Sequence, residues 1–481
     1  MAERRFTNLI KYCFHLFWKH FLLASPPIIL LLVGGTWSET WGAPTSESSV
    51  GLKTQGYLGS SHSENSSQFS AFHATWQGEE SGAVFETRAQ AELLLSLDHT
   101  GFSYVEIPES YVGSSKKMGF AQLIAGRKRV QWNKLDDTWN LGIWQPRFRW
   151  DYLEPEKVGL IGAFLKVDRP TFQLVAFGSP AFLPERGAPI DYQDGSFTSL
   201  SPWFQGLPSQ ALYRDILTPV YYRAEIPSMS EIVSHGGVSI LARMNEDPEK
   251  GGGFWAQGAL SYKPINQLLI GYRGQYNLST KNFEITLYPR VAYQKLVSIE
   301  GGYTKKRGGV WFSGFAENPV RDQTPEQWNT QEVAPSLALS WGADLNLFLE
   351  GSSPSQFSIA YLRQWGGNAT DKGPDVKSMS SLEARYPFQN ALSLKVKHPF
   401  DSYFGNWGRD LTSSFKLIYD FENTGNIISA DFQYKILTNL SVSLGGDIIS
   451  SDKTMGPNSE VDFINRYKSN DRIRGEMVYA F

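Results

Sequence analysis

Apolar and polar residues alternate one by one in runs of eight to twelve residues, and such runs recur along most of the chain beyond residue 50. Clear cases are 83–95 (AVFETRAQAELLL), 428–436 (ISADFQYKI) and 440–448 (LSVSLGGDI). Side chains of a β-strand point alternately to its two faces, so a period of two predicts strands with one apolar and one polar face. No long stretch with the 3.6-residue period of a helix appears in this part of the chain. The pattern therefore predicts an all-β protein.

The segment 472–481 shows the alternation most strictly, and it ends on an aromatic residue. One face carries Ile473, Gly475, Met477, Tyr479 and Phe481, and the other carries Arg472, Arg474, Glu476, Val478 and Ala480. A tilted strand of about ten residues is long enough to cross the hydrocarbon layer of a membrane. This segment alone is also compatible with the last strand of a soluble sandwich, so the rest of the chain has to decide.

Two features favour a membrane barrel over a soluble antiparallel sheet. The second face stays polar over many consecutive strands, and aromatic residues make up 14% of the chain and recur at strand ends. In a membrane barrel the apolar face points outward to lipid and the polar face lines a wet lumen, with aromatic rings at both interfaces. We therefore predict a transmembrane antiparallel up-and-down β-barrel of 16–22 strands, most consistent with 18–20.

Connections between the predicted strands are of two lengths. Short ones are predicted at 167–170, 263–266, 342–344, 388–390 and 437–439, and long polar ones at 132–157, 180–236, 318–332, 366–376 and 451–471. Tight periplasmic turns and longer external loops give this asymmetry in outer-membrane barrels. When the strands are counted alternately up and down, however, two of the long connections fall on the side of the short turns. This disagreement disappears only if strands near 216–225 and 309–317 have been missed or wrongly assigned.

The N-terminal part has the order of a secretory signal. Four basic residues precede the apolar run 21–34 (FLLASPPIILLLVG), and small residues follow it. The run is too short and too interrupted by proline for a spanning helix. We predict a signal peptide at 1–43, with Gly35 and Gly42 as other cleavage positions, and a single barrel at 44–481; an uncleaved anchor is the alternative. Cys13 is the only cysteine, so a disulfide framework is excluded.

Two motifs carry a resemblance to a known class of proteins. The C-terminal strand resembles the β-signal of Gram-negative outer-membrane barrels, with Tyr479 two residues before Phe481. The pattern Glu109-x-Tyr111-Val112, followed by Gly126-Arg127 and Val130-x-Trp132, resembles an early hairpin of porin-like families, although Asn133 stands where those families usually have glycine.

This resemblance implies the outer membrane of a Gram-negative bacterium as the location. It also implies recognition of Tyr479 and Phe481 by the barrel assembly machinery, contact with lipopolysaccharide, a pore-lining Arg127 and a homo-oligomer.

Charged residues interleaved with tryptophan crowd the segment 127–154. One interpretation is a loop folded into the lumen, whose charges form a constriction. The other is an external loop held by ion pairs and stacked rings, and we slightly favour it. The candidate pore-lining residues are Arg127, Arg129, Arg273, Arg290, Arg385, Lys395, Lys397, Arg472, Arg474 and Glu476. Basic residues slightly outnumber acidic ones on this face, which predicts a channel with a weak preference for anions. The simpler alternative is that these charges only pair with one another along the wall of the lumen.

Chemistry at a catalytic or metal site is not predicted. The histidines beyond the signal are scattered, and no phosphate loop is present. None has metal-ligand spacing, and none pairs with a nearby serine as an outer-membrane lipase or acyl hydrolase would require. The net charge of −3 does not favour nucleic-acid binding. We therefore predict no enzyme activity, no cofactor and no metal.

The predicted function is a porin-like channel for passive diffusion of small hydrophilic solutes. The alternative is a non-conducting structural or adhesive barrel filled by loops such as 180–236, which either plugs the lumen or covers its mouth.

Overall fold

The structure is a computed structural model of the chain. It describes residues 45–59, 66–204, 207, 209–213, 216–245, 252–320, 329–347, 353–367, 369–372, 385–400, 410–452 and 462–481. The predicted signal peptide at 1–43 and Cys13 lie outside the described residues.

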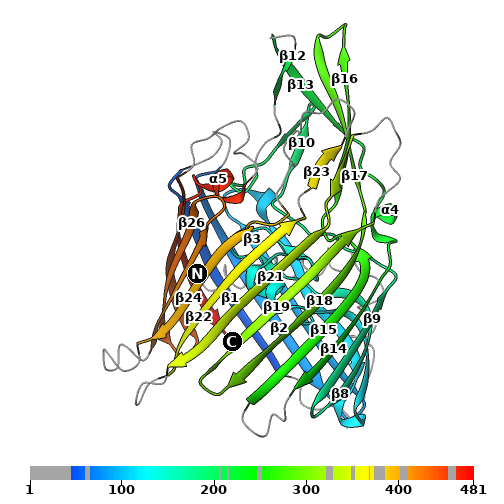
Figure 1. Cartoon of the computed structure of the whole chain (residues 1–481). Coiled ribbons are helices and arrows are strands. Elements are labelled where there is room, and N and C mark those ends of the chain that lie inside the picture. Colours follow the sequence, from blue (N-terminus) through cyan, green and yellow to red (C-terminus); the bar gives the residue numbers. More distant parts are fainter. Residues whose placement is uncertain are drawn as a thin grey trace, which may run out of the picture.

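Eighteen strands form one antiparallel sheet that closes on itself, because β1 pairs with both β2 and β28 (Figure 1). In the order of their pairing they are β1 (Thr45–Tyr57), β2 (Gln68–Ser81), β3 (Phe85–Ser96), β4 (Tyr104–Ser114), β5 (Ala121–Lys128), β8 (Leu160–Arg169), β9 (Phe172–Ser179), β14 (Gly237–Asn245), β15 (Gly252–Pro264), β18 (Tyr293–Lys305), β19 (Gly308–Pro319), β21 (Ser336–Leu347), β22 (Ser355–Gly366), β24 (Asn390–Pro399), β25 (Leu411–Asp420), β26 (Gly425–Leu437), β27 (Leu440–Ser451) and β28 (Arg472–Ala480). The predicted fold class is confirmed, and the strand number lies within the predicted range.

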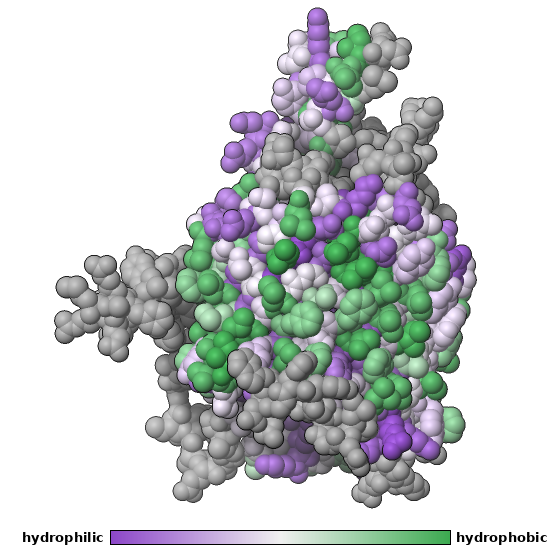
Figure 2. Space-filling model, turned by 90° about the vertical axis from the view of Figure 1, so that its left-hand side faces the viewer, coloured by the Kyte–Doolittle hydropathy of each residue, from purple (hydrophilic) through white to green (hydrophobic). Residues whose placement is uncertain are grey.

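The apolar faces of the strands point outward, as the alternation predicts. On β18, Ile299 is 68% exposed while its neighbour Ser298 is 4% exposed, and on β28 Ile473 is 53% exposed while Arg472 is 1% exposed. Figure 2 shows apolar residues covering much of the barrel wall. Such an exterior is compatible with lipid and not with water. Among the described residues, no helix is both long and apolar enough to span a membrane.

Long and short connections lie at opposite ends of the barrel. The end with the long connections carries 129–159, 180–236, 265–292, 320–335, 367–389 and 452–471, and the other end has short turns such as 170–171, 306–307 and 438–439. Of the predicted short turns, 342–344 is wrong because it lies inside β21, and 263–266 and 388–390 border long connections. Of the two doubtful strands, β19 belongs to the barrel and β13 (Ile216–Ala224) does not, so the up-and-down order closes.

A second sheet projects beyond the end that carries the long connections (Figure 1). It has six strands, paired in the order β12 (Gln210–Tyr213), β13, β17 (Asn282–Arg290), β16 (Leu269–Asn277), β20 (Asn329–Val333) and β23 (Ala369–Lys372), and a hairpin of β10 (Asp191–Gln193) and β11 (Ser196–Thr198) lies beside it. The prediction that Arg273 and Arg290 line the pore is wrong, because β16 and β17 pair outside the barrel. Alternation marks a two-faced strand, and it does not say which sheet the strand joins.

The remaining elements are short. They are α3 (Lys134–Trp139), α4 (Met229–Val233), α5 (Phe463–Tyr467), the 3-10 turns η1 (Thr100–Phe102) and η2 (Lys116–Met118), and the strand pair β6 (Arg147–Phe148) and β7 (Glu156–Lys157).

The direction of the faces can be tested on β27. Leu444 points outward and is 60% exposed, whereas its neighbour Ser443 points inward opposite Glu476. We expect Leu444→Arg to lower the free energy of unfolding by about 2–4 kcal/mol, because it places a cation against lipid near the middle of the strand. Ser443→Arg is the matched control and should cost much less, since it reaches the wet lumen. Urea unfolding of the protein in lipid vesicles measures both, and equal losses would contradict the assignment of faces.

Candidate functional site

The loop 129–159 is organised by two buried polar side chains. Asn133 caps α3 by accepting a hydrogen bond from the Asp136 backbone N–H at 2.9 Å. The carboxylate of Asp136, 2% exposed, then accepts from the backbone N–H groups of Ile143 and Trp144, each at 3.0 Å. A carboxylate that satisfies several amide donors fixes a loop without regular structure. The loop therefore has a defined shape of its own.

This loop lies inside the barrel, against strands β15 to β21. Glu300 on β18 accepts from the backbone N–H of Lys134 at 2.6 Å, and the indole N–H of Trp139 donates to Ser340 on β21 at 3.0 Å. Trp132, Trp139 and Trp144 of the loop are buried, and the rings of Trp132 and Trp144 stack with their centres 5.9 Å apart. The interpretation that we favoured from the sequence, an external loop, is wrong about its location. The ion pairs and stacked rings that it invoked are present.

The far side of the same loop is held by arginines of β28. Arg472 forms ion pairs with Asp151 of the loop and Asp447 of β27, both at 2.6 Å. Arg474 pairs with Glu154 of the loop, and with Asp431 of β26 at 2.8 Å. Burial disfavours the charged form of Asp151, but the charge of Arg472 outweighs it and holds the pKa of that carboxyl below its usual value.

Two further connections pack on the loop. The indole ring of Trp203, 2% exposed, lies 6.0 Å from the ring of Tyr152 and 5.3 Å from that of Tyr467. The Tyr467 hydroxyl donates to the Trp203 carbonyl at 2.9 Å, and the Asn470 amide donates to the Pro202 carbonyl at 2.7 Å. We call the segments 129–159, 199–204 and 462–471 together the loop plug. The sequence left open whether the connection 180–236 plugs the lumen or covers its mouth. The segment 199–204 enters the plug, and β10 to β13 of the same connection lie outside the barrel.

The loops cover the inner wall all the way round in the half of the barrel nearer the long connections. Each of the eighteen strands has at least one inward-facing side chain that is less than 9% exposed. One such residue from each strand, in order, is Gln55, Ala71, Leu94, Glu106, Ile124, Phe164, Val175, Leu241, Ala259, Leu296, Phe315, Ala338, Leu362, Ala391, Ile418, Ile427, Asp447 and Arg472. Many of them are apolar, so this half of the lumen is a packed core.

The half nearer the short turns is a wet vestibule with a basic wall. A cavity of about 200 Å³ runs from this end along β5, β8 and β9 to the start of the loop 129–159, so its inner end borders the packed core at Ile124, Phe164 and Val175. It is lined by Glu86, Tyr111, Lys116, Gln122, Ile124, Lys128, Arg129, Val130, Phe164, Lys166, Gln173 and Val175. The Lys128 ammonium lies 3.5 Å from the centre of the Tyr111 ring. On the opposite wall, Lys395 of β24 stands directly across from Lys416 of β25. Both lysine side chains are partly exposed.

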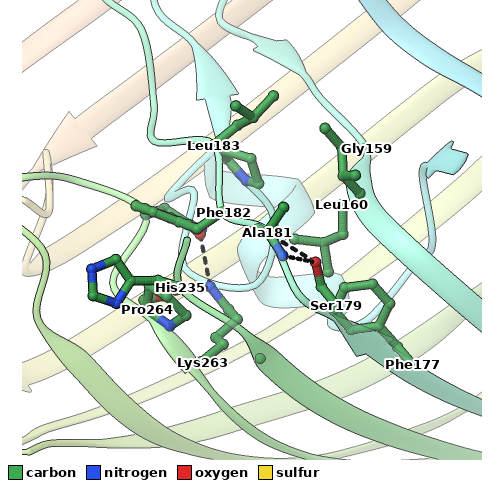
Figure 3. Close-up of a pocket in the computed structure, with 14 residues that line it drawn as sticks. Gly159, Leu160, Phe177, Ser179, Ala181, Phe182, Leu183, His235, Lys263 and Pro264 are labelled. Carbon is green, nitrogen blue, oxygen red and sulfur yellow. Dashed lines mark hydrogen bonds between the residues drawn. The ribbon is translucent and has the colours of Figure 1, made fainter. Parts of the chain in front are cut away.

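A smaller cavity lies at the opposite end of the barrel, where β9, β14 and β15 meet the loops (Figure 3). Lys263 is 3% exposed there, and its ammonium donates to the Asn266 side chain at 2.7 Å and to the Pro264 carbonyl at 3.3 Å. The volume of about 30 Å³ has room for little more than a water molecule. This cavity is therefore a packing defect at the rim and not a solute site.

Most of the predicted pore-lining residues are engaged in ion pairs. Arg127 pairs with Glu106 at 2.7 Å, Arg129 lies 3.5 Å from Glu109 and also donates to Gln90, and Arg385 pairs with the buried Glu317 at 2.7 Å. Glu476 lies 3.7 Å from His73. Of the predicted set, Lys395 and Lys397 make no ion pair within the described part of the chain. Tyr479 and Phe481 lie outside the barrel, with ring centres 5.0 Å apart.

Sequence reasoning missed several residues of the site. Asp136, Glu300 and Trp203 look like ordinary loop or strand residues, and only the three-dimensional contacts reveal their roles. Lys416 carried a usable signal, because it alternates with apolar residues on the run that became β25.

One contact corrects the expectation about histidines. Ser355 and His398, 43 residues apart in sequence, lie side by side on β22 and β24, with the Ser355 hydroxyl 2.7 Å from His398 Nδ1. No group of three or more potential metal ligands occurs among the residues that the structure describes.

Similar folds occur among solved outer-membrane structures. The chain is similar to Acinetobacter baumannii OccAB3, with 12% identity, a TM-score of 0.46, and 91% of this chain and 99% of the other covered. It is also similar to Pseudomonas aeruginosa OccK2 (OpdF) in complex with glucuronate, with 8% identity, a TM-score of 0.46, and coverage of 92% and 99%. For Pseudomonas aeruginosa OpdQ the identity is 10%, the TM-score is 0.45, and the coverage is 91% and 96%.

No protein-family model and no curated protein matches the sequence. The likeness to solved structures therefore concerns overall shape alone.

An acidic contact between loop and wall is sensitive to pH. Burial and the charge of the neighbouring Glu92 raise the pKa of Glu156 from 4.5 to about 8. The folded protein therefore binds more protons than the unfolded chain between these values, and stability falls as the pH rises from 4.5 to 8. We expect Glu156→Gln to remove this fall, so that its stability advantage over the wild type grows between pH 5 and pH 8 and is constant above. Urea unfolding across this range measures it; a pH-independent difference would contradict the assignment.

Proposed function

We propose that this protein is a channel of the Gram-negative outer membrane for passive diffusion of small hydrophilic solutes. The apolar exterior faces lipid, and the charged vestibule opens toward the periplasm. The loop plug closes the external half in the conformation described above. The short turns then lie on the periplasmic side and the projecting sheet outside the cell.

A like-charged pair inside the lumen carries this proposal. Lys395 and Lys416 stand opposite each other on neighbouring strands, and neither makes an ion pair within the described residues. Equal charges in this position destabilise a sheet. Asp344, an acid on the same inner wall, is already paired with Lys134 at 2.9 Å. A lumen built only for stability would pair these lysines, whereas a channel gains from leaving them available to a passing anion.

The other candidate residues have a different role in this proposal. Arg127, Arg129, Arg385, Arg472 and Arg474 are neutralised by carboxylates of the wall and of the loops. We therefore assign the weak anion preference mainly to Lys395, Lys397 and Lys416, with Lys128 on the opposite side of the vestibule. Glu476 contributes the opposing charge near His73.

The remaining parts of the proposal concern assembly and partners. Tyr479 and Phe481 are 39% and 74% exposed at the end of the last strand, where the barrel assembly machinery would recognise them. The exposed outer rim would meet lipopolysaccharide, and a homo-oligomer is proposed on the porin resemblance alone. We propose no enzyme activity and no cofactor.

The plug itself favours a second candidate, a non-conducting barrel with a structural or adhesive role at the cell surface. Buried side chains on all eighteen strands are what such a barrel would show. Purified protein in a planar bilayer separates the two. Stepwise ohmic openings support the channel, and silence of a correctly folded protein supports the structural role.

Anion preference can be assigned to the lysine pair by substitution. In a salt gradient, we expect Lys395→Ala/Lys416→Ala to move the reversal potential toward the cation side, because two uncompensated positive charges leave the vestibule. Arg223→Ala is the control, since Arg223 is an exposed cation on β13 outside the barrel. An unchanged reversal potential in the lysine variant, in a channel that still conducts, would refute the role of this pair.

A further inference from the structure

We propose that the ion pair between Asp151 and Arg472 is a latch that holds the loop plug closed, and that its release lets the part of the plug next to β27 and β28 move out of the lumen. The proposal rests on the channel function only for its effect on conductance. The movement itself can be measured without any solute.

Arg472 is the point where two loops meet the wall. Its guanidinium binds Asp151 of the loop 129–159 and Asp447 of β27, and lies 5.6 Å from the centre of the Trp203 ring. The side chains of Arg472, Asp151 and Asp447 are 0%, 7% and 1% exposed. Losing one partner leaves the others as buried charges, so such a contact is either fully made or fully broken.

The parts of the plug next to Arg472 are bound to one another. Tyr152, Trp203, Phe463 and Tyr467 form one aromatic group, with ring centres 5.1–6.4 Å apart along its contacts. The hydrogen bonds from Tyr467 and Asn470 to the backbone at 202–203 join the last connection to the same group. Displacing the stretch around Tyr152 would therefore disturb the ring contacts that cover Trp203.

The two sides of the plug differ in how they are held. Toward β15–β21 the loop buries Trp132, Trp139 and Trp144, which would lose their apolar contacts if they moved into water. Toward β26–β28 the loop 129–159 contacts the wall through the ion pairs of Asp151 and Glu154. The helix α5 instead packs the apolar side chains of Phe463 and Ile464 against β26 and β27. The loop stretch 151–154 is therefore the part of the plug that release of Arg472 can free, with the tryptophan side and α5 as its fixed support.

The charges around the latch favour release once Arg472 is occupied. Arg472 and Arg474 face four carboxylates, those of Asp151, Glu154, Asp431 and Asp447. An anion that binds Arg472 in place of Asp151 would leave these carboxylates with too few partners, and their repulsion would push the loop away from the wall. The vestibule lysines lie nearer the short turns than Arg472 does, and they would attract such an anion toward it.

Thiol accessibility tests the latch directly. Ser201 lies in the plug beside Trp203 and is 3% exposed, so Ser201→Cys in a Cys13→Ser background should react slowly with a membrane-impermeant maleimide. Adding Asp151→Asn should raise the labelling rate at least about tenfold, because the neutral amide no longer compensates Arg472. The substitution lies in a loop and leaves the assembly strand β28 unchanged.

The matched control is Asp344→Asn, which removes a carboxylate paired with Lys134 in the vestibule. It should leave the labelling rate at Ser201→Cys unchanged. Equal labelling with and without Asp151→Asn would overturn the latch, and so would an equal rise with Asp344→Asn, since that rise reports general loosening. Folding of each variant is checked by its resistance to unfolding in detergent before heating.

Conductance separates the latch from the channel proposal. If the channel proposal holds, Asp151→Asn should increase the open fraction in a bilayer. Faster labelling without conductance in any variant would support the latch and reject the channel. Equal conductance of wild type and Asp151→Asn, with equal labelling, would reject the latch and keep the channel.

Discussion

Closure of the sheet by β1 and β28 is the constraint on which the rest of the structure depends. A strand in lipid has no water to satisfy its backbone groups, so each of the eighteen strands needs a partner on both sides. Closure also fixes which side chains face inward. Arg472 and Arg474 are placed in the lumen by the same register that places Ile473 and Met477 against lipid. The ion pairs that organise the plug are therefore a direct result of how the ring closes.

The interior is divided into a dry half and a wet half, and the division follows the loops. Near the long connections, wall and loops share a packed core with buried tryptophans, and near the short turns the wall carries partly exposed lysines. The wall alternates in the same way in both halves. What differs is whether a loop such as 129–159 covers it, so the properties of the lumen are set by the connections more than by the strands.

The barrel could be predicted from the sequence because its main signal is local. The period of two in 428–436 and in 472–481 reports strand and face together, and both runs lie where that pattern places them. The same signal misplaced Arg273 and Arg290 in the pore, because the strands β16 and β17 of the projecting sheet alternate too. The site depends on contacts between distant residues, such as Lys134 with Glu300 and Tyr467 with Trp203. Neither spacing nor composition encodes those contacts, so the position of the loop 129–159 could only be guessed.

The external sheet ties together connections that would otherwise be separate. It takes β12 and β13 from 180–236, β16 and β17 from 265–292, β20 from 320–335 and β23 from 367–389. Surface loops generally tolerate insertions and deletions. Here, removing any one of these four would leave the edge of a neighbour without its backbone partner. The four connections are therefore constrained to change together, and this end of the barrel has less freedom to vary than its separate loops suggest.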